Sequence, residues 1–467
     1  MRSSRTLALG ATMLAVVLTA CSSGGGSSPA PTAAGSSSAP ATAAASAAAS
    51  GGGAKPLIKI GSDGFYEAEL MAQIYGQVLA ANGYPVNYDG VGIGAAPDAS
   101  AYGDEGSNTL GNLARAVGGL SLPNLERAGL GRIAALDGVA AVESPLGAWG
   151  SMLPKSAGKD STSGHWEICG LHVSRPFPTY PRGFPADVVA EFSRRTGRGV
   201  IGNVVGSGTE IIQRFGQEHE RTGAWIVYTS ADSVFQIAAH EGVVPLAELY
   251  QGCQSAREIL VAPNDVSRVI ARPFSGRVGH YTRTANRRDF ALPPPGETLL
   301  DALASAGIPR QGVGKVDDLF AGRGISSEHT ANNAAGVAAI HRKLKEMDGG
   351  LLLANLVDFD QAWGHRNDIA GFYQGLRAFD EELPGLDAAL RKEDLLFITA
   401  DHGNDPTTPS TDHARERVPL LALGRPVHPV SLGERSTFSD LGATVAEWLG
   451  ISFRGRGQSF LSALLRS

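Results

Sequence analysis

The sequence predicts an α/β fold in which a mainly parallel sheet lies between helices. Two runs, residues 351–357 and 395–400, are apolar on both faces, which is typical of strands in a parallel sheet covered on each side. Segments with helical periodicity accompany them at residues 330–347, 371–391 and 439–449. Both strands run into acidic and imidazole side chains, and ligands bind beyond the carboxyl ends of such strands.

Length and composition narrow the class of protein. The chain has 467 residues, which is enough for two or three domains, and its net charge of −6 with 18% charged residues indicates no nucleic-acid partner and no acidic-membrane partner. Its three cysteines, Cys21, Cys169 and Cys253, are too few for a disulfide framework.

The N-terminus has the pattern of a secretory signal. Arg2 and Arg5 precede an apolar run over residues 7–18, which ends in a bacterial lipobox at Cys21. Residues 1–21 are therefore expected to be a lipoprotein signal, and a lipid on Cys21 is the one membrane attachment that the sequence predicts. Residues 22–54 consist almost entirely of Ser, Gly, Ala, Pro and Thr and predict a disordered tether.

A short folded segment is expected at residues 55–88. Its pattern predicts a strand at 57–60, a helix over 65–82 that Gly83 closes, and a second short strand at 85–88. Together with the signal and the tether, this segment resembles the N-terminus of osmoprotectant-type substrate-binding lipoproteins.

Two polar stretches follow. Residues 89–94 have glycine at every second position. Pro97 stands where a dinucleotide-binding loop needs its last glycine, and no strong strand precedes the stretch, so we reject a dinucleotide-binding loop here. Residues 158–167 predict a polar loop that enters a helix. A hydroxyl there, such as that of Ser161, is well placed to carry a phosphoryl group, because helix N-termini favour negative charge. The alternative is a simple helix N-cap.

Potential metal ligands follow both predicted strands. Asp360 and His365 come after the first, and Asp401, His402 and His413 come after the second. Oxygen and nitrogen donors without a thiolate suit manganese, zinc or magnesium. Any one of them could merely cap a helix or make a turn, but five at two adjacent strand ends favour a metal centre.

Six stretches of the sequence resemble phosphopentomutases, which are metal-dependent members of the alkaline phosphatase superfamily: residues 89–94, 158–167, 228–233, 268–274, 355–365 and 399–413. The resemblance covers residues 89–467. It implies an alkaline phosphatase-like catalytic core made of residues 89–175 and 291–467. An α+β cap of residues 176–290 would be inserted in it, with helices at 186–196 and 246–260 and strands at 224–228 and 266–272.

The resemblance also implies roles for individual residues. Ser161 would be the nucleophile that is phosphorylated. One manganese ion would be held by Asp89, Asp401, His402 and the Ser161 oxygen, and a second by Asp360, His365 and His413, with magnesium, zinc or cobalt as alternative metals. The pentose phosphate would contact four residues of the cap: Ser230, Asp232, Arg268 and Ile270.

The implied reaction interconverts the 1- and 5-phosphates of ribose or 2-deoxyribose through a phosphoserine enzyme and a bisphosphate intermediate. Glucose 1,6-bisphosphate or a similar sugar bisphosphate would be the activator. Three alternatives remain at this point: another metal-dependent phosphatase or mutase of the superfamily, an osmolyte-binding lipoprotein without enzymatic activity, and an inactive fusion. The resemblance implies a cytoplasmic protein, whereas the lipobox implies a lipid-anchored protein at the cell surface.

In the family that the sequence resembles, the first metal ligand ends an apolar central strand. The resemblance therefore implies that the residues before Asp89 form this strand. Pro85 lacks an N–H for the ladder, and Asn87 would place an amide in an apolar layer. We therefore expect residues 86–88 to fill the central position imperfectly and to lower the stability of the fold.

Overall fold

The computed structural model describes residues 82–230 and 232–465, so the expectations for the signal, the tether and residues 55–81 lie outside the described residues. The larger of two sheets has eight strands in the order β10-β9-β11-β1-β12-β13-β2-β14. Its strands are β1 (Asn82–Tyr88), β2 (Ala148–Met152), β9 (Arg310–Val313), β10 (Ser327–Glu328), β11 (Gly350–Leu356), β12 (Asp394–Ala400), β13 (Val418–Leu423) and β14 (Ser431–Arg435).

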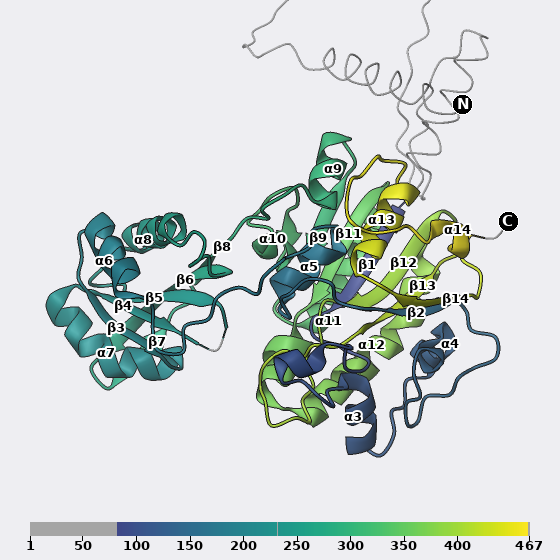
Figure 1. Ribbon diagram of the computed structural model, residues 1–467, viewed down its shortest axis with the longest axis horizontal. Coiled ribbons are helices and arrows are strands. Elements are labelled where there is room, and N and C mark those ends of the chain that lie inside the picture. Colours follow the sequence, from purple (N-terminus) through teal and green to yellow (C-terminus); the bar gives the residue numbers. More distant parts are fainter. Residues whose placement is uncertain (1–81, 231, 466–467) are drawn as a thin grey trace, which may run out of the picture. The chain divides into compact units, whose positions relative to one another are not determined.

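This sheet is parallel at its centre. The strands from β10 to β12 pair in parallel, as do β2 and β14, and only β13 runs antiparallel to its neighbours. Strands β11 and β12 are buried along their whole length, because helices lie on both faces of the sheet (Figure 1). The predicted α/β fold of the alkaline phosphatase type is confirmed.

The helices form two groups around this sheet. In one group α13 (Ser439–Trp448) packs with α5 (Ser161–Ile168), α9 (Leu299–Ser305) and α14 (Leu461–Leu464) and contacts β1. In the other, α11 (Asn333–Glu346) packs on α12 (Ile369–Ala389), which also contacts α3 (Thr109–Ala116) and α4 (Pro123–Ala128). Within the described residues, no helix is both long enough and apolar enough to cross a bilayer.

Several short elements complete this part of the chain and lie mostly at its loops. They are η1 (Ala99–Tyr102), η2 (Leu130–Arg132), α10 (Val316–Leu319), the π-helix η3 (Phe359–Trp363) and η4 (Gly364–Arg366). The π-helix directly follows strand β11, and α10 follows β9. Both therefore begin at the carboxyl edge of the parallel strands, where a site is expected.

A second, six-stranded sheet lies within residues 200–291, inside the stretch expected to form the cap. Its strands are β3 (Val200–Val205), β4 (Trp225–Thr229), β5 (Val234–His240), β6 (Arg268–Arg277), β7 (His280–Arg283) and β8 (Arg288–Ala291). Helices α6 (Ala186–Thr196) and α8 (Leu246–Ile259) pack on each other, and α7 (Gly208–Thr222) contacts β3, β4, β5 and β7. The predicted helices at 186–196 and 246–260 match α6 and α8, whereas the strand expected from Val266 begins at Arg268.

Strand β1 occupies the centre of the large sheet, as the residues before Asp89 were expected to do. It is longer than expected, since pairing with β12 runs from Asn82 to Tyr88. The prediction that a helix ends at Asn82 and is closed by Gly83 is therefore wrong, because both residues belong to strand β1 and pair with β11 and β12. The pairing with β11 is interrupted at Tyr84 and Pro85, as a residue without an N–H requires.

Candidate metal centre

The seven predicted metal-site residues come together at the carboxyl ends of β1, β11 and β12. Asp89 follows β1, Asp401 and His402 follow β12, and Ser161 is the first residue of α5. Ser161 is not the N-cap, because the Asp160 side chain accepts the Ser163 backbone N–H at 3.1 Å. The Ser161 hydroxyl instead donates to Asp89 Oδ1 at 2.9 Å and lies 3.2 Å from His402 Nε2.

We call Asp89, Ser161, Asp401 and His402 the buried half of the centre, since none of them is more than 9% exposed. His402 Nε2 lies 3.3 Å from Asp89 Oδ1 and 3.7 Å from Asp401 Oδ2. The other Asp401 oxygen accepts the Gly90 backbone N–H at 3.2 Å. The serine oxygen, two carboxylates and an imidazole thus lie close together.

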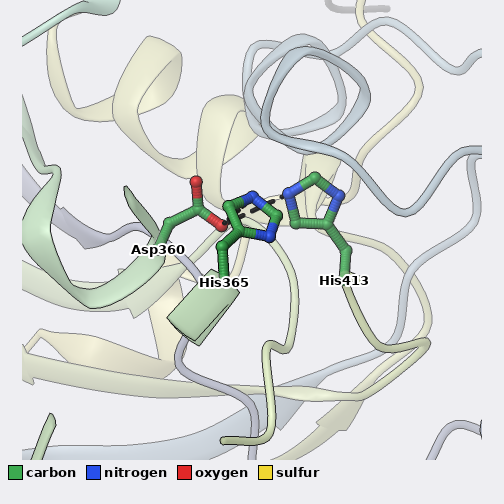
Figure 2. A group of neighbouring side chains, drawn as sticks. All are labelled: Asp360, His365 and His413. Carbon is green, nitrogen blue, oxygen red and sulfur yellow. Dashed lines mark ion pairs between the residues drawn. The ribbon is translucent and has the colours of Figure 1, made fainter. Parts of the chain in front are cut away.

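The open half consists of Asp360, His365 and His413, and Figure 2 shows both imidazoles turned toward the carboxylate. The Nε2 atoms of His365 and His413 lie 3.2 and 3.3 Å from Asp360 Oδ1. The His365 Nδ1–H donates to the carbonyl oxygen of Thr411 at 2.6 Å, which leaves Nε2 for a ligand. These side chains come from the π-helix η3, from η4 and from the loop after β12.

Asp360 also joins the two halves. One of its oxygens, one of Asp89 and one ring nitrogen of His402 all lie within 4.8 Å of one another. Asp360 was expected in the open half alone, so its place beside Asp89 adds a carboxylate to the buried half. Asp401, in contrast, belongs to no such cluster among the described residues. Its Oδ2 lies 3.0 Å from His165 Nδ1.

Three contributors were missed from the sequence. Lys315 Nζ lies 2.5 Å from Asp89 Oδ2 and 4.0 Å from Asp360 Oδ2. Asn404 Nδ2 donates to Asp360 Oδ1 at 2.9 Å, and His165 Nδ1–H donates to the carbonyl of Ser161 at 2.9 Å. Lys315 follows strand β9 and His165 lies one helical turn after Ser161, so strand-end position and i, i+4 spacing were available signals.

The sequence predicted that Asn87 would be an unfavourable buried amide, and the structure gives a partner to its Nδ2 group but none, among the described residues, to its buried Oδ1. Asn87 is fully buried, and its Nδ2 lies 3.2 Å from His165 Nε2. Its register partner Asn355 in β11 points Nδ2 at the same nitrogen, at 3.4 Å. The polar residues in the centre of the sheet thus hold His165, which in turn contacts Ser161 and Asp401.

The charges of the centre shift its pKa values strongly. Burial would raise the pKa of Asp89, but Lys315 and then His402 hold it far below its usual value. Burial lowers the pKa of His402, but Asp401 and Asp89 together raise it to about 10. Burial likewise lowers the pKa of His365, and Asp360 raises it to about 9. The carboxylates therefore give the centre an excess of negative charge, which favours bound cations.

The donor set fits divalent metal ions. It offers carboxylate, imidazole and hydroxyl donors, while the described cysteines, Cys169 and Cys253, are buried outside the clusters. Asp89, Asp360 and His402 form one candidate group of metal ligands, and Asp360, His365 and His413 form another. Buried carboxylates this close together are characteristic of a site for a hard or borderline dication.

A cleft of about 1600 Å³ opens over this centre. Its walls include Ser161 and the whole open half, and they also include the four residues expected to contact substrate: Ser230, Asp232, Arg268 and Ile270. Ser230 Oγ lies 3.5 Å from Asp232 Oδ2, and Arg268 Nη1 lies 3.5 Å from Asp289 Oδ2. Asp89, Asp401 and His402 lie beneath this surface.

Comparisons with known proteins agree with this geometry. The model of the Metalloenzyme superfamily matches residues 86–453, so the chain is a member of that superfamily. A phosphopentomutase of Desulfitobacterium hafniense is 55% identical over 81% of this chain and 98% of its own length. One of Acetivibrio thermocellus is 54% identical, with the same coverage of both chains. The chain belongs to the phosphopentomutase family of this superfamily and is an enzyme.

Solved structures with lower sequence identity are similar as well. Leishmania mexicana phosphoglycerate mutase has a TM-score of 0.43 and 12% identity, over 81% of this chain and 97% of that chain. The PH0037 protein of Pyrococcus horikoshii has a TM-score of 0.41 and 15% identity, over 80% and 99% of the two chains.

Proposed function

We propose that this enzyme interconverts the 1- and 5-phosphates of ribose or 2-deoxyribose. The observation that carries the proposal is the position of Ser161. Ser161 is the first residue of helix α5, and its hydroxyl contacts both Asp89 and His402. It lines the same cleft as Ser230, Asp232 and Arg268. The names of the relatives at about 55% identity support the same reaction.

In the proposed reaction Ser161 carries the phosphoryl group between substrates. Phosphoserine gives its group to the free C1 or C5 oxygen of the sugar monophosphate, which loses its proton, and a bisphosphate forms. Ser161 then takes back the phosphoryl group from the other end of the sugar and releases the isomeric monophosphate. Asp89 Oδ1, which accepts the Ser161 hydroxyl at 2.9 Å, orients that hydroxyl within the centre.

Two metal ions, held by the buried and the open half, would neutralise the transferring group and lower the pKa of the serine hydroxyl. The backbone N–H groups at the start of α5 favour a phosphate on Ser161. Arg268 offers a planar guanidinium that binds the non-reacting phosphate through two hydrogen bonds. Manganese as the native metal, and a sugar bisphosphate that phosphorylates Ser161 at the start, belong to the same proposal.

The test is an assay that separates isomerisation from hydrolysis. Ribose 1-phosphate is incubated with the enzyme, manganese and a trace of glucose 1,6-bisphosphate, and ribose 5-phosphate and inorganic phosphate are measured together. We expect conversion with little phosphate release, loss of conversion in Ser161→Ala, and recovery in Ser161→Thr, which keeps a hydroxyl. Release of one phosphate for each sugar consumed would identify a phosphatase instead.

The location of the enzyme is a separate proposal. We propose that Cys21 is lipidated and that residues 22–54 tether the enzyme to the membrane. Fractionation of cells tests this, since the wild-type chain should be found with membranes and a Cys21→Ala chain should not. Wild-type protein in the soluble cytoplasmic fraction would contradict the anchor and agree with the location that the family resemblance implies.

A further inference from the structure

A buried carboxylate that the proposed reaction does not use lies on the loop between β12 and β13, which also carries His413. This residue, Glu416, is 1% exposed, and burial raises its pKa to about 7. Three donors hold its side chain: the Thr109 hydroxyl at 2.7 Å, the Thr109 backbone N–H at 2.9 Å and the Gly94 backbone N–H at 3.2 Å. Because burying a carboxylate is costly unless donors satisfy it, the fold is built to keep Glu416 in one place.

The alternating glycines of residues 89–94 make room for this carboxylate. A Cβ on Gly92 would lie 2.2 Å from Glu416 Oε2, and a Cβ on Gly403 would lie 2.6 Å from Glu416 Oε1. Gly94 donates its N–H from a backbone with a φ of +117°, which residues other than glycine rarely adopt. The glycine pattern, which does not fit a dinucleotide-binding loop, therefore encloses the Glu416 side chain.

Hydrogen bonds connect Glu416 to the metal centre. The Thr109 hydroxyl, which donates to Glu416, accepts the backbone N–H of Asn404 at 3.2 Å. The Asn404 side chain in turn donates from Nδ2 to Asp360 Oδ1 at 2.9 Å. Thr109, Asn404 and Glu416 are each at most 1% exposed, so these bonds lie in the low-dielectric interior, where they are stronger than in water. Asn404 has little room to turn, since a Cβ on Gly364 would lie 2.5 Å from its Nδ2.

We propose that Glu416, Thr109 and Asn404 are positioning residues, which together fix the carboxylate of Asp360. Asp360 belongs to both candidate groups of metal ligands, whereas Glu416 belongs to neither. The orientation of Asp360 therefore affects both halves of the centre. Partners that hold a ligand in its binding orientation raise the affinity for the metal. The inference rests on the proposed role of Asp360 as a metal ligand.

Manganese affinity of the full-length protein, measured by calorimetric titration, tests the proposal. Thr109→Val keeps the size of the side chain and removes the hydroxyl between Glu416 and Asn404, so manganese should bind about tenfold or more weakly. Thr109→Ser keeps a hydroxyl and should bind manganese within about twofold of the wild type. Thr444→Val is the matched control, because Thr444 is equally buried but its hydroxyl donates within helix α13, to the carbonyl of Asp440 at 2.7 Å. It should lower the melting temperature without weakening manganese.

Asn404→Ala gives a second test, since it removes the last bond of the connection and leaves Thr109 bonded to Glu416. It should also weaken manganese about tenfold or more. Because both changes interrupt one connection, the double variant should bind manganese at most about twofold more weakly than Asn404→Ala alone. Effects that multiply in the double variant, equal affinities of Thr109→Val and Thr444→Val, or an unchanged affinity in Asn404→Ala would each overturn the proposal.

Asp360→Ala separates this proposal from the proposed function, and it should weaken manganese more than either single variant. If Asp360→Ala binds manganese like the wild type, the proposed ligand set fails and the positioning residues fail with it. If Asp360→Ala loses manganese but Thr109→Val and Asn404→Ala do not, the positioning residues alone fail. If all affinities are as expected but the wild-type enzyme has no mutase activity, the positioning residues stand and the proposed reaction fails.

Discussion

The two halves of the metal centre are held in different ways. The buried half rests on strand ends and on the start of α5, and Asp89, Asp401 and His402 are each at most 3% exposed. The open half rests on a π-helix and a loop, and the side chains of His365 and His413 are 23% and 11% exposed. Ligands fixed by a sheet have little freedom to adjust, whereas ligands on loops can move as substrates enter and leave. We infer that the buried half is preorganised and that the open half adapts during turnover.

The largest effect is expected from Asp89→Asn in the buried half. It removes the negative charge of a proposed metal ligand that also accepts the Ser161 hydroxyl, so activity should fall by more than about 100-fold. It also leaves Lys315 beside a neutral amide. Removing one partner of a buried ion pair costs about 3–5 kcal/mol. Lys315 is 23% exposed, so we expect the low end of this range: the unfolding free energy of the metal-free protein should fall by about 3 kcal/mol. Urea unfolding measures this loss, with Asp387→Asn on the surface of α12 as control. An unchanged unfolding midpoint would show that the Asp89–Lys315 pair contributes nothing.

The next comparison sets His402→Ala against His365→Ala. Water can replace an exposed imidazole, so His365→Ala should weaken one metal by about 10- to 100-fold and regain activity in excess manganese. His402 is enclosed, so His402→Ala should stay inactive at any manganese concentration. Activity measured against manganese concentration tests this, with the surface variant His341→Ala as control. If both variants recover equally, the halves do not differ in rigidity.

The pH dependence of metal binding should follow from the raised pKa values of His402, about 10, and His365, about 9. Both imidazoles carry a proton near neutral pH in the metal-free protein, and a metal ligand must be neutral. Metal binding should therefore release protons, and affinity should rise with pH until about pH 9–10. The stability that these groups give the metal-free fold is complete below the unfolded-state pKa of about 6.5 and is lost as pH rises through 9 and then 10.

Calorimetric titration with manganese in two buffers of different ionisation enthalpy measures the protons released. The same binding enthalpy in both buffers, with an affinity that does not depend on pH, would mean that the histidines are already neutral.

The smallest effect is expected at an aromatic contact between the residues next to Asp89 and Asp360. Tyr88, next to Asp89, packs edge-on against Phe359, next to Asp360, with ring centroids 5.4 Å apart. Its buried hydroxyl has no partner among the described residues. Tyr88→Phe should therefore stabilise the fold by about 1 kcal/mol and leave metal affinity unchanged. Tyr102→Phe is the control, because its hydroxyl donates to Ala157 at 2.9 Å and its loss should destabilise. A loss of stability in Tyr88→Phe would show that the hydroxyl is used.

The sequence predicted the strands and the edge at which the ligands lie, but it did not predict the contacts that join the two halves. Apolar runs that end in Asp401–His402 and near Asp360 predicted the strands and the carboxyl edge, because burial on both faces constrains sequence strongly. The helix predicted up to Asn82 was wrong at its end, since pairing with β11 and β12 overrides local periodicity. The joining role of Asp360 and the contact of Lys315 with Asp89 depend on which strands are neighbours. Sequence spacing does not contain that information.

Asn87 gives the clearest example of the same limit. As a single residue it predicted an unfavourable amide in a central strand. Its partners His165 and Asn355 come from α5 and β11, and only the assembled sheet brings them together. The expectation that the segment before Asp89 lowers stability stays a prediction: the Nδ2 group of Asn87 has a partner, but its buried Oδ1 has none among the described residues.

The central claim is that Ser161 carries the phosphoryl group between the two ends of the sugar. The most direct measurement incubates the manganese-loaded enzyme with glucose 1,6-bisphosphate and maps phosphate by peptide mass spectrometry. We expect one phosphorylated site, Ser161, no phosphate in Ser161→Ala, and transfer of the group to added ribose 5-phosphate. Full isomerase turnover without phosphate on Ser161, or phosphate on another residue that transfers at the catalytic rate, would contradict the account.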